Sequence, residues 1–297
     1  MSAEQALAVA FAVGAAFFYA LSNVLQQHEA EQLPEDDTLK LGLLARLARR
    51  PRWVAGMGSD VGGYVFEALA LGAGTLVLVE PILSTALLLS LFLGRIITKR
   101  HIPAEGWIAA VVLAAGVSLF LYQTSPEGGV AIASDRAWLV AVPPVVAVVF
   151  GCVALAQLTH GARRAAYLGA AAGTLFAVSA VLTKAFVHFL GGGVFNWVDH
   201  WEPYALAVSS ITGLVLAQSA FQTGELAAAV GSEQVLQPLV GVALGVGLLQ
   251  EQITVAGPLA HLALGLALAA MVWGVLALSR IENPRTQLSG PEISTEE

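Results

Sequence analysis

The chain has 297 residues, of which 57% are hydrophobic and only 12% charged, and its mean hydropathy is +0.75. A soluble domain carries about 25% charged residues, so this composition excludes a typical water-soluble protein and favours one that spans a membrane. The formal net charge of −7 says little about orientation, because acidic residues contribute weakly to it. The single cysteine, Cys152, excludes an internal disulfide bond.

Apolar segments near 20 residues recur along the chain, and this is the length a helix needs to cross the hydrocarbon core. The first segment has no basic residue before Ala6 and is too long for a cleavable signal peptide, so it is expected to be a spanning helix. The sequence predicts an all-α polytopic membrane protein with nine transmembrane helices. Their expected ranges are about 6–27, 53–72, 74–97, 104–123, 137–158, 165–187, 203–222, 226–249 and 256–279.

The basic residues predict the orientation. If the N-terminus is outside, nine crossings place twelve of the 14 Lys and Arg residues on one side. Arg136 falls on the other side, and Lys184 lies within the sixth span. Basic residues gather in cytoplasmic loops, so we expect a multi-pass protein of the cytoplasmic membrane with its C-terminus inside.

Two segments are expected to lie outside the bundle. The stretch 38–50, "TLKLGLLARLARR", places its leucines on one helical face and its basic residues off it. This pattern suits a short helix in the membrane interface, or an amphipathic connector packed on the protein. The tail 281–297 has little apolar content and is expected to be disordered and cytoplasmic.

An internal repeat is visible at a constant offset of 157 residues. "AFFYALSNVLQQ" (16–27) matches "GTLFAVSAVLTK" (173–184), and Pro81 matches Pro238. We expect each proline to break its helix and free a carbonyl toward a cavity in both halves. The first repeat would cover 1–123 and the second 161–280, with a linker and the crossing span five in 124–160. An odd number of spans between them makes the second repeat enter the membrane from the opposite face, as in secondary transporters with inverted repeats.

The segments around the two prolines carry a family resemblance. "ALALGAGTLVLVEPILSTALLLSLFLG" (68–94) and "AFQTGELAAAVGSEQVLQPLVGVALGVGLLQE" (220–251) resemble the EamA-type repeat of the drug/metabolite transporter superfamily. The nine-span layout and "GTLFAVSAVLTKAF" (173–186) most resemble its NIPA-like magnesium transporter branch. The resemblance implies transport of small metabolites, drugs or divalent cations. In this repeat a Glu closes the proline-containing helix; Glu251 matches it in the second copy, whereas the first copy has Gly94 and Arg95.

Acidic residues lie inside three of the predicted spans. A charged side chain at mid-bilayer costs roughly 2.5–3.5 kcal/mol, so these groups must be neutral, paired or facing water. On the second span Asp60, Tyr64 and Glu67 share one helical face. At about 1.5 Å rise per residue, Glu67 and Glu80 reach the same depth on adjacent antiparallel helices. Glu233 lies in the eighth span.

Three interpretations of these acids stay open. In the first, Lys184 pairs with Glu67 or Glu80 and the other acids remain protonated, because desolvation disfavours the charged form. In the second, one carboxylate carries a coupling proton. In the third, Glu67 and Glu80 help to bind Mg²⁺, which takes oxygen ligands and keeps several waters.

Further polar residues and the glycines have more ordinary explanations. Several amide side chains could line a cytoplasmic vestibule, although interhelical hydrogen bonds explain them equally well. These amides are Asn23, Gln26, Gln27, Gln218 and Gln222, with Gln237 beside Pro238 closer to the acids. Gly169 and Gly173 have the GxxxG spacing that allows close helix packing, and close contact also explains the glycines of "GMGSDVGG" (56–63).

The expected function is secondary transport of a small solute by alternating access, coupled to a proton or cation through the intramembrane carboxylates. The alternatives are a divalent-cation transporter and a non-transporting membrane scaffold or accessory subunit. No sequence motif indicates an enzyme or a cofactor. The expected partners are a small-molecule or ion substrate and membrane lipids, with a homodimer as an option and no nucleic acid.

Overall fold

The computed structural model describes residues 3–30, 49–98, 104–123, 125–193, 195–221, 223, 226–254 and 257–281, most of which are helical. The helices are α1 (Ala3–Ala30), α3 (Pro51–Ala73), α4 (Leu76–Leu83), α5 (Ala86–Thr98), α6 (Ala104–Gln123), α7 (Asp135–Gln157), α8 (Gly161–Gly191), α9 (Glu202–Phe221), α10 (Leu226–Gly247) and α11 (Pro258–Ile281). The described residues of each of the nine predicted spans are mostly helical, and the third span is divided between α4 and α5. Residues 31–48, with most of the predicted interfacial helix, and the tail after Ile281 lie outside the described residues.

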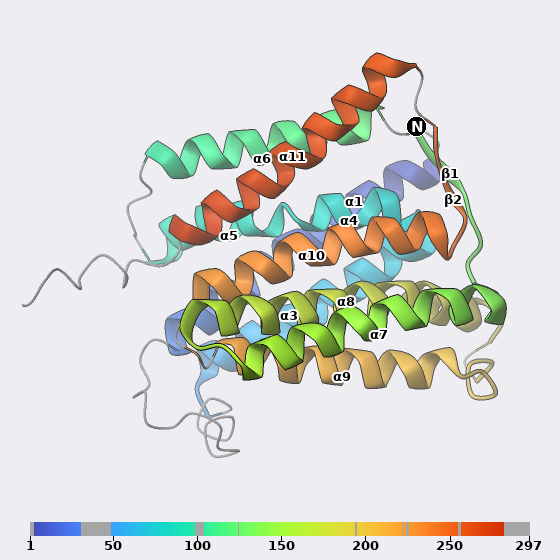
Figure 1. Ribbon diagram of the computed structural model, residues 1–297, viewed down its shortest axis with the longest axis horizontal. Helices are drawn as coiled ribbons and strands as arrows, with labels where there is room; N and C mark the ends of the chain where they lie inside the picture. Colours follow the sequence, from blue (N-terminus) through green and yellow to red (C-terminus); the bar gives the residue numbers. More distant parts are fainter. Residues whose placement is uncertain are drawn as a thin grey trace, which may run out of the picture.

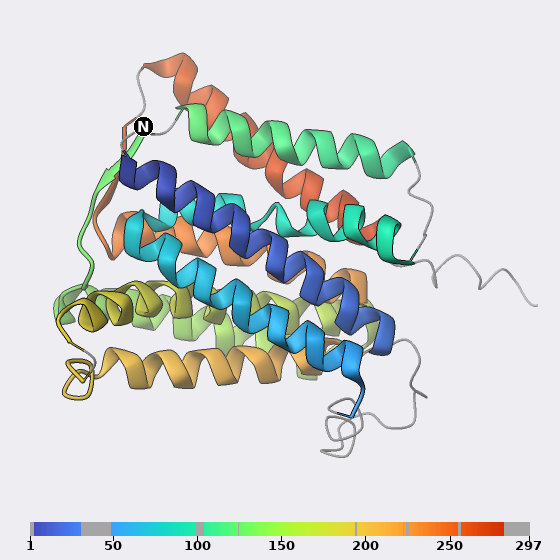
Figure 2. The same ribbon diagram turned by 180° about the vertical axis from the view of Figure 1, so that it is seen from behind.

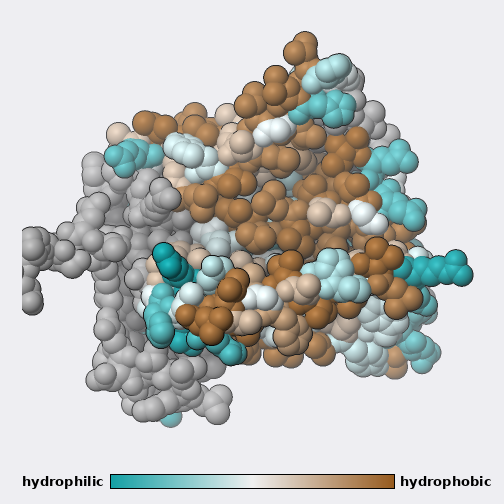
Figure 3. Space-filling view, viewed as in Figure 1, coloured by the Kyte–Doolittle hydropathy of each residue, from teal (hydrophilic) through white to brown (hydrophobic). Residues whose placement is uncertain are grey.

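Apolar side chains cover the outside of this bundle as well as its core. On α7, Leu139, Val140 and Phe150 are 75%, 76% and 70% exposed. Figure 3 shows a broad hydrophobic band between more polar ends. Five described helical segments are long and apolar enough to cross a membrane, namely Ala3–Gln26, Leu76–Ile97, Asp135–Gln157, Gly161–Gly191 and Pro258–Ala277. A lipid-facing surface explains these exposed residues, and the chain is a helical membrane protein.

The helices are arranged around two internal contacts. α4 packs against α10 in the middle of the molecule, and α6 packs against α11 along one edge (Figures 1 and 2). α1 packs on α3, and α8 packs on both α9 and α10. α7 lies mainly against α8, which leaves most of its surface exposed.

A short antiparallel sheet departs from the predicted all-α fold. β1 (Ser125–Gly128) follows α6 and pairs with β2 (Glu251–Thr254), which follows α10, with Ser125 opposite Thr254. Apolar periodicity could not predict these strands, because each has only four residues and lies beyond the end of an apolar helix. The pairing holds the ends of α6 and α10 on the same side of the molecule (Figure 1).

The two prolines, which we expected to break both helices alike, have different effects. After Pro81 the chain leaves the helix at Ser84–Thr85, which separate α4 from α5. The Ser84 hydroxyl donates to the Pro81 carbonyl at 2.7 Å, and the Thr85 hydroxyl donates to the Ile82 carbonyl at 2.6 Å. By contrast, α10 continues through Pro238 without interruption. The expected symmetry of the break is therefore wrong.

Glycines allow α8 and α10 to approach each other closely. A Cβ atom at Gly173 would lie 2.6 Å from the carbonyl oxygen of Glu233, and one at Gly169 would overlap the carbonyl of Ala229. The predicted packing role of this GxxxG pair is confirmed. Gly56, Gly62 and Gly63 have the same role between α3 and α1, where a Cβ at Gly63 would lie 2.7 Å from the Tyr19 ring, whereas a Cβ at Gly58 would meet nothing within 4 Å.

We expect Gly173→Ala to lower the stability of the protein by about 1–3 kcal/mol, because the added methyl group overpacks a tight helix contact. Thermal unfolding of the purified protein in detergent, followed by tryptophan fluorescence, measures this loss. Gly151→Ala on α7 is the matched control, because a Cβ there has open space within 4 Å. Equal melting temperatures for the two variants would contradict the packing role.

Candidate functional site

A polar seam runs between α1 and α3. The Tyr19 hydroxyl donates to Glu67 Oε2 at 2.5 Å. Closer to the end of α1, Gln26 Nε2 donates to Ser22 Oγ at 2.7 Å and lies 3.5 Å from Asp60 Oδ2. The two acids of the polar face predicted on α3, Asp60 and Glu67, therefore point toward α1.

Tyr64, the third residue of that face, reaches a different helix. Its hydroxyl shares a 3.0 Å hydrogen bond with the Thr183 hydroxyl on α8. The contact joins α3 to the helix that begins the second predicted repeat. Thr183 directly precedes Lys184 on α8, and Lys184 also contacts another part of the bundle, as described below.

Glu80 lies at the contact between α4 and α10. Its side chain is 1% exposed, and neither carboxyl oxygen has a hydrogen-bond partner among the described residues. The Gln237 amide lies beside it without hydrogen-bond geometry, and Glu67 is close enough to interact with it electrostatically. Two acids predicted to share one depth thus lie in one neighbourhood.

Glu233 extends this group along α10. Its Oε2 atom is enclosed without a hydrogen-bond partner in the described part of the chain, and Asp60 lies close enough to interact with it electrostatically. We refer to Asp60, Glu67, Glu80 and Glu233 as the acidic cluster. Its members come from α3, α4 and α10, so both predicted repeats contribute to it.

Lys184 has a partner that the sequence did not predict. Its Nζ atom lies 2.7 Å from Oε1 of Glu251, and the two side chains are 11% and 0% exposed. The same carboxylate accepts hydrogen bonds from the backbone N–H groups of Leu76 at 2.9 Å and Val77 at 3.0 Å. The pairing of Lys184 with Glu67 or Glu80, one of the three interpretations left open, is therefore wrong. Glu251 instead joins α8, β2 and the first turn of α4.

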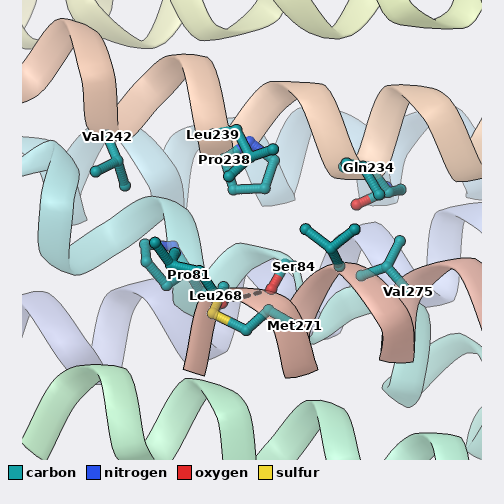
Figure 4. Close-up of a pocket in the computed structure, with 11 residues that line it drawn as sticks. Pro81, Ser84, Gln234, Pro238, Leu239, Val242, Leu268, Met271 and Val275 are labelled. Atoms are coloured by element: carbon teal, nitrogen blue, oxygen red, sulfur yellow. Dashed lines mark hydrogen bonds between the residues drawn. The ribbon is translucent and has the colours of Figure 1, made fainter. Parts of the chain in front are cut away.

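A pocket lies beside the acidic cluster, where the two prolines approach each other. Pro81 and Ser84 line it from one side, Gln234 and Pro238 from α10, and Met271 from α11 (Figure 4). Its lining is mainly apolar, with the remaining residues Val235, Leu239, Val242, Leu268, Val272 and Val275. None of the four acids lines this pocket.

Of the five predicted vestibule residues, only Asn23 and Gln26 have side chains among the described residues. Asn23 is exposed, whereas Gln26 contacts Asp60 inside the α1–α3 seam. Gln222 and the side chains of Gln27 and Gln218 lie outside the described residues. Among the residues that are described, no three His, Cys, Asp or Glu side chains gather as a metal site would require. A Mg²⁺ ion at Glu67 and Glu80 would therefore depend on water or substrate for most of its ligands.

Two contributors to the site were not singled out by sequence reasoning. Tyr19 was detectable, because Tyr19, Ser22 and Gln26 follow the i, i+3, i+7 spacing of one helical face. Glu251 stood out only as the acid that closes the EamA-type repeat. Its partners were not predictable, because it lies on an extended segment beyond the end of α10, where helical spacing gives no direction.

Comparison with known proteins finds a relative along nearly the whole chain. The uncharacterized protein Cgl0250/cg0304 of Corynebacterium glutamicum is 31% identical over 280 residues, which cover 92% of this chain and 95% of the relative. The chain belongs to the same family as this protein. No family model matches the chain, and no solved structure matches it. The shared length includes both halves of the bundle, so the two proteins have a common overall architecture.

We expect Glu251→Gln to destabilise the protein by about 3–5 kcal/mol, because it leaves the buried Lys184 ammonium without a counter-charge. Lys184→Met is expected to cost less, since two backbone donors still bind Glu251. Thermal unfolding of both single variants and the double variant gives the coupling energy, expected at about 0.5–3 kcal/mol. Strictly additive losses would contradict the pairing.

Proposed function

We propose that this protein is a secondary transporter that moves a small solute across the cytoplasmic membrane by alternating access. The acidic cluster carries this proposal. Charged side chains inside a membrane are costly and are characteristic of ion or substrate pathways. A bundle that only had to be stable would place apolar residues at these four positions.

The paired strands support the proposed topology of nine crossings. With the N-terminus outside, the fourth and eighth crossings both end on the outer side. These crossings are α6 and α10, and the segments that follow them pair as β1 and β2. Two segments on opposite sides of a membrane could not pair. The same topology places the start of α4, with Glu251 and Lys184, toward the outer side.

The helix packing supports an inverted repeat. In the first half α1 packs on α3 and on α4–α5, and in the second half α8 packs on α9 and on α10 in the same way. The equivalent helices α4 and α10 contact each other, as do α6 and α11. Contacts between equivalent helices are expected around a pseudo-twofold axis, and transporter sites lie at such repeat interfaces near the midplane. α7 supplies the extra crossing at the edge.

The resemblance to the drug/metabolite transporter superfamily agrees with this proposal and suggests an organic solute as the substrate. A NIPA-like Mg²⁺ transporter is the second candidate, favoured by the electrostatic contact between Glu67 and Glu80. Because Mg²⁺ keeps several of its waters, it would bind there only in a conformation that opens the space around Glu80, whose carboxyl oxygens are enclosed here. The two candidates differ in what should stabilise the purified protein.

The test is a thermal-shift screen of the purified protein with MgCl₂, amino acids, nucleotide sugars and cationic drugs. We expect one class to stabilise the wild type, by about 2.7 kcal/mol at a hundred times its Kd. The stabilisation should be lost in Glu80→Gln and Glu67→Gln but kept in Glu105→Gln, whose side chain is exposed at the start of α6. Uptake of the same class into proteoliposomes, with and without a pH gradient, then tests transport.

Two results would contradict the proposal. Full transport by folded Glu67→Gln and Glu80→Gln variants would show that the acids are not the site. No stabilising ligand, together with co-purification of another membrane protein at fixed stoichiometry, would indicate a scaffold or accessory subunit.

A further inference from the structure

Two carboxyl groups lie one helical turn apart on the same face of α10. A Cβ atom at Gly241 would lie 2.7 Å from Glu80 Cγ and 3.3 Å from its Oε1. A Cβ atom at Gly245 would lie 2.6 Å from Glu251 Oε2. Positions i and i+4 of a helix are neighbours, with Cβ atoms about 5–6 Å apart. The Glu80 and Glu251 carboxyls are therefore neighbours that occupy adjacent glycine positions.

These two neighbours have opposite surroundings. Glu251 receives three donors, namely the Lys184 ammonium and the N–H groups of Leu76 and Val77. Glu80 receives no donor from the described residues, although it is more than nine-tenths buried. Carboxyl groups whose environments differ in this way hold different charge states. Glu251 is accordingly the ionised member of the pair.

The start of α4 offers Glu80 no compensation. A helix N-terminus normally favours a carboxylate through its free N–H groups. Here Leu76 and Val77 donate to Glu251, while Leu78 donates to the Thr75 hydroxyl and Val79 to the Thr75 carbonyl. The donors of this first turn are used before the chain reaches Glu80. An anionic Glu80 would therefore be buried without a partner, which costs several kcal/mol.

The space around Glu80 also excludes a metal ion in this conformation. The carboxyl group packs directly on the α10 backbone at Gly241. Mg²⁺ would need near-octahedral oxygen ligands at about 2.0–2.1 Å, with several waters among them. A proton needs no additional volume and removes the charge that the site cannot stabilise.

We propose that Glu80 is a proton-binding site, loaded and occluded in this conformation, whose outer side is closed by the Glu251–Lys184 pair. The proposal rests on the proposed function only in making this proton the coupling ion. The groups near Glu80 on neighbouring elements are Glu67 on α3, Gln237 on α10 and Glu251, to which Lys184 is bound. When α4 and α10 separate, water reaches the carboxyl group, the proton passes to that water, and Glu80 becomes an anion able to hold a cationic group.

Glutamine substitution distinguishes the two charge states. Gln resembles a protonated Glu in size and charge, so Glu80→Gln should keep the melting temperature of the wild type at neutral pH. Glu251→Gln, its matched contrast, should lower the melting temperature because it replaces an ionised group. A large loss of stability in Glu80→Gln, comparable to that in Glu251→Gln, would overturn the proposal.

Infrared spectroscopy of the protein reconstituted in liposomes detects protonated carboxyl groups directly. We expect the carbonyl stretching band of a protonated carboxyl group at neutral pH, with one component missing in Glu80→Gln and retained in Glu105→Gln. An unchanged band in Glu80→Gln would show that Glu80 is ionised and would overturn the proposal. This measurement needs no substrate. If the component is lost in Glu80→Gln but the protein transports no solute, the proton site stands and the transporter function is rejected.

Discussion

The Glu251 carboxylate is the contact on which the arrangement of the two halves depends. It binds the Lys184 ammonium and two backbone N–H groups of α4 at once, and its side chain is fully buried. A helix that begins inside a membrane protein needs acceptors for its first N–H groups, because lipid supplies none. Here the acceptor comes from the other half of the molecule. The start of α4, the segment after α10 and the C-terminal part of α8 are thereby fixed relative to one another.

This contact explains why Lys184, which lies within the sixth predicted span, does not neutralise the acidic cluster. Lys184 binds Glu251, so it does not neutralise Glu67, Glu80 or Glu233, which must be protonated or stabilised by other groups. Glu67 has the Tyr19 hydroxyl, whereas Glu80 has no donor among the described residues. A buried ion pair does not by itself stabilise a fold strongly, because desolvation offsets the attraction. Here the ion pair determines which carboxyl group receives the cation: Glu251 is paired with Lys184, and its neighbour Glu80 is left without a counter-charge.

The sequence predicted the helices well, because apolar segments of membrane length are a strong and local signal. It also predicted that Glu67 and Glu80 lie at one depth, because the helical rise and the short connection between the two helices determine their relative heights. The partner of Lys184 was out of reach, because Glu251 lies on a four-residue strand whose direction depends on pairing with β1. The contribution of Tyr19 was readable from its spacing with Ser22 and Gln26. The substrate was not readable, because the pocket beside the cluster is lined mainly by apolar residues with no distinctive chemistry.

The different effects of the two prolines follow from the residues that come after them. At the offset of 157, Ser84 and Thr85 correspond to Gly241 and Val242. In the first half, the two hydroxyls bind the carbonyls of Pro81 and Ile82 and stabilise the break between α4 and α5. In the second half there are no such hydroxyls, and α10 stays helical.

The glycine that replaces Ser84 in the second half has a role of its own. Gly241 leaves the space that the Glu80 carboxyl occupies, so a side chain there would displace the acid. One half thus supplies the carboxyl group and an interrupted helix, and the other supplies a continuous helix with a slot that fits it. An exactly symmetric repeat would have placed two carboxyls or two empty slots at this contact. If the two halves are an inverted repeat, as proposed, their divergence at these positions places one carboxyl group, Glu80, at the contact between α4 and α10.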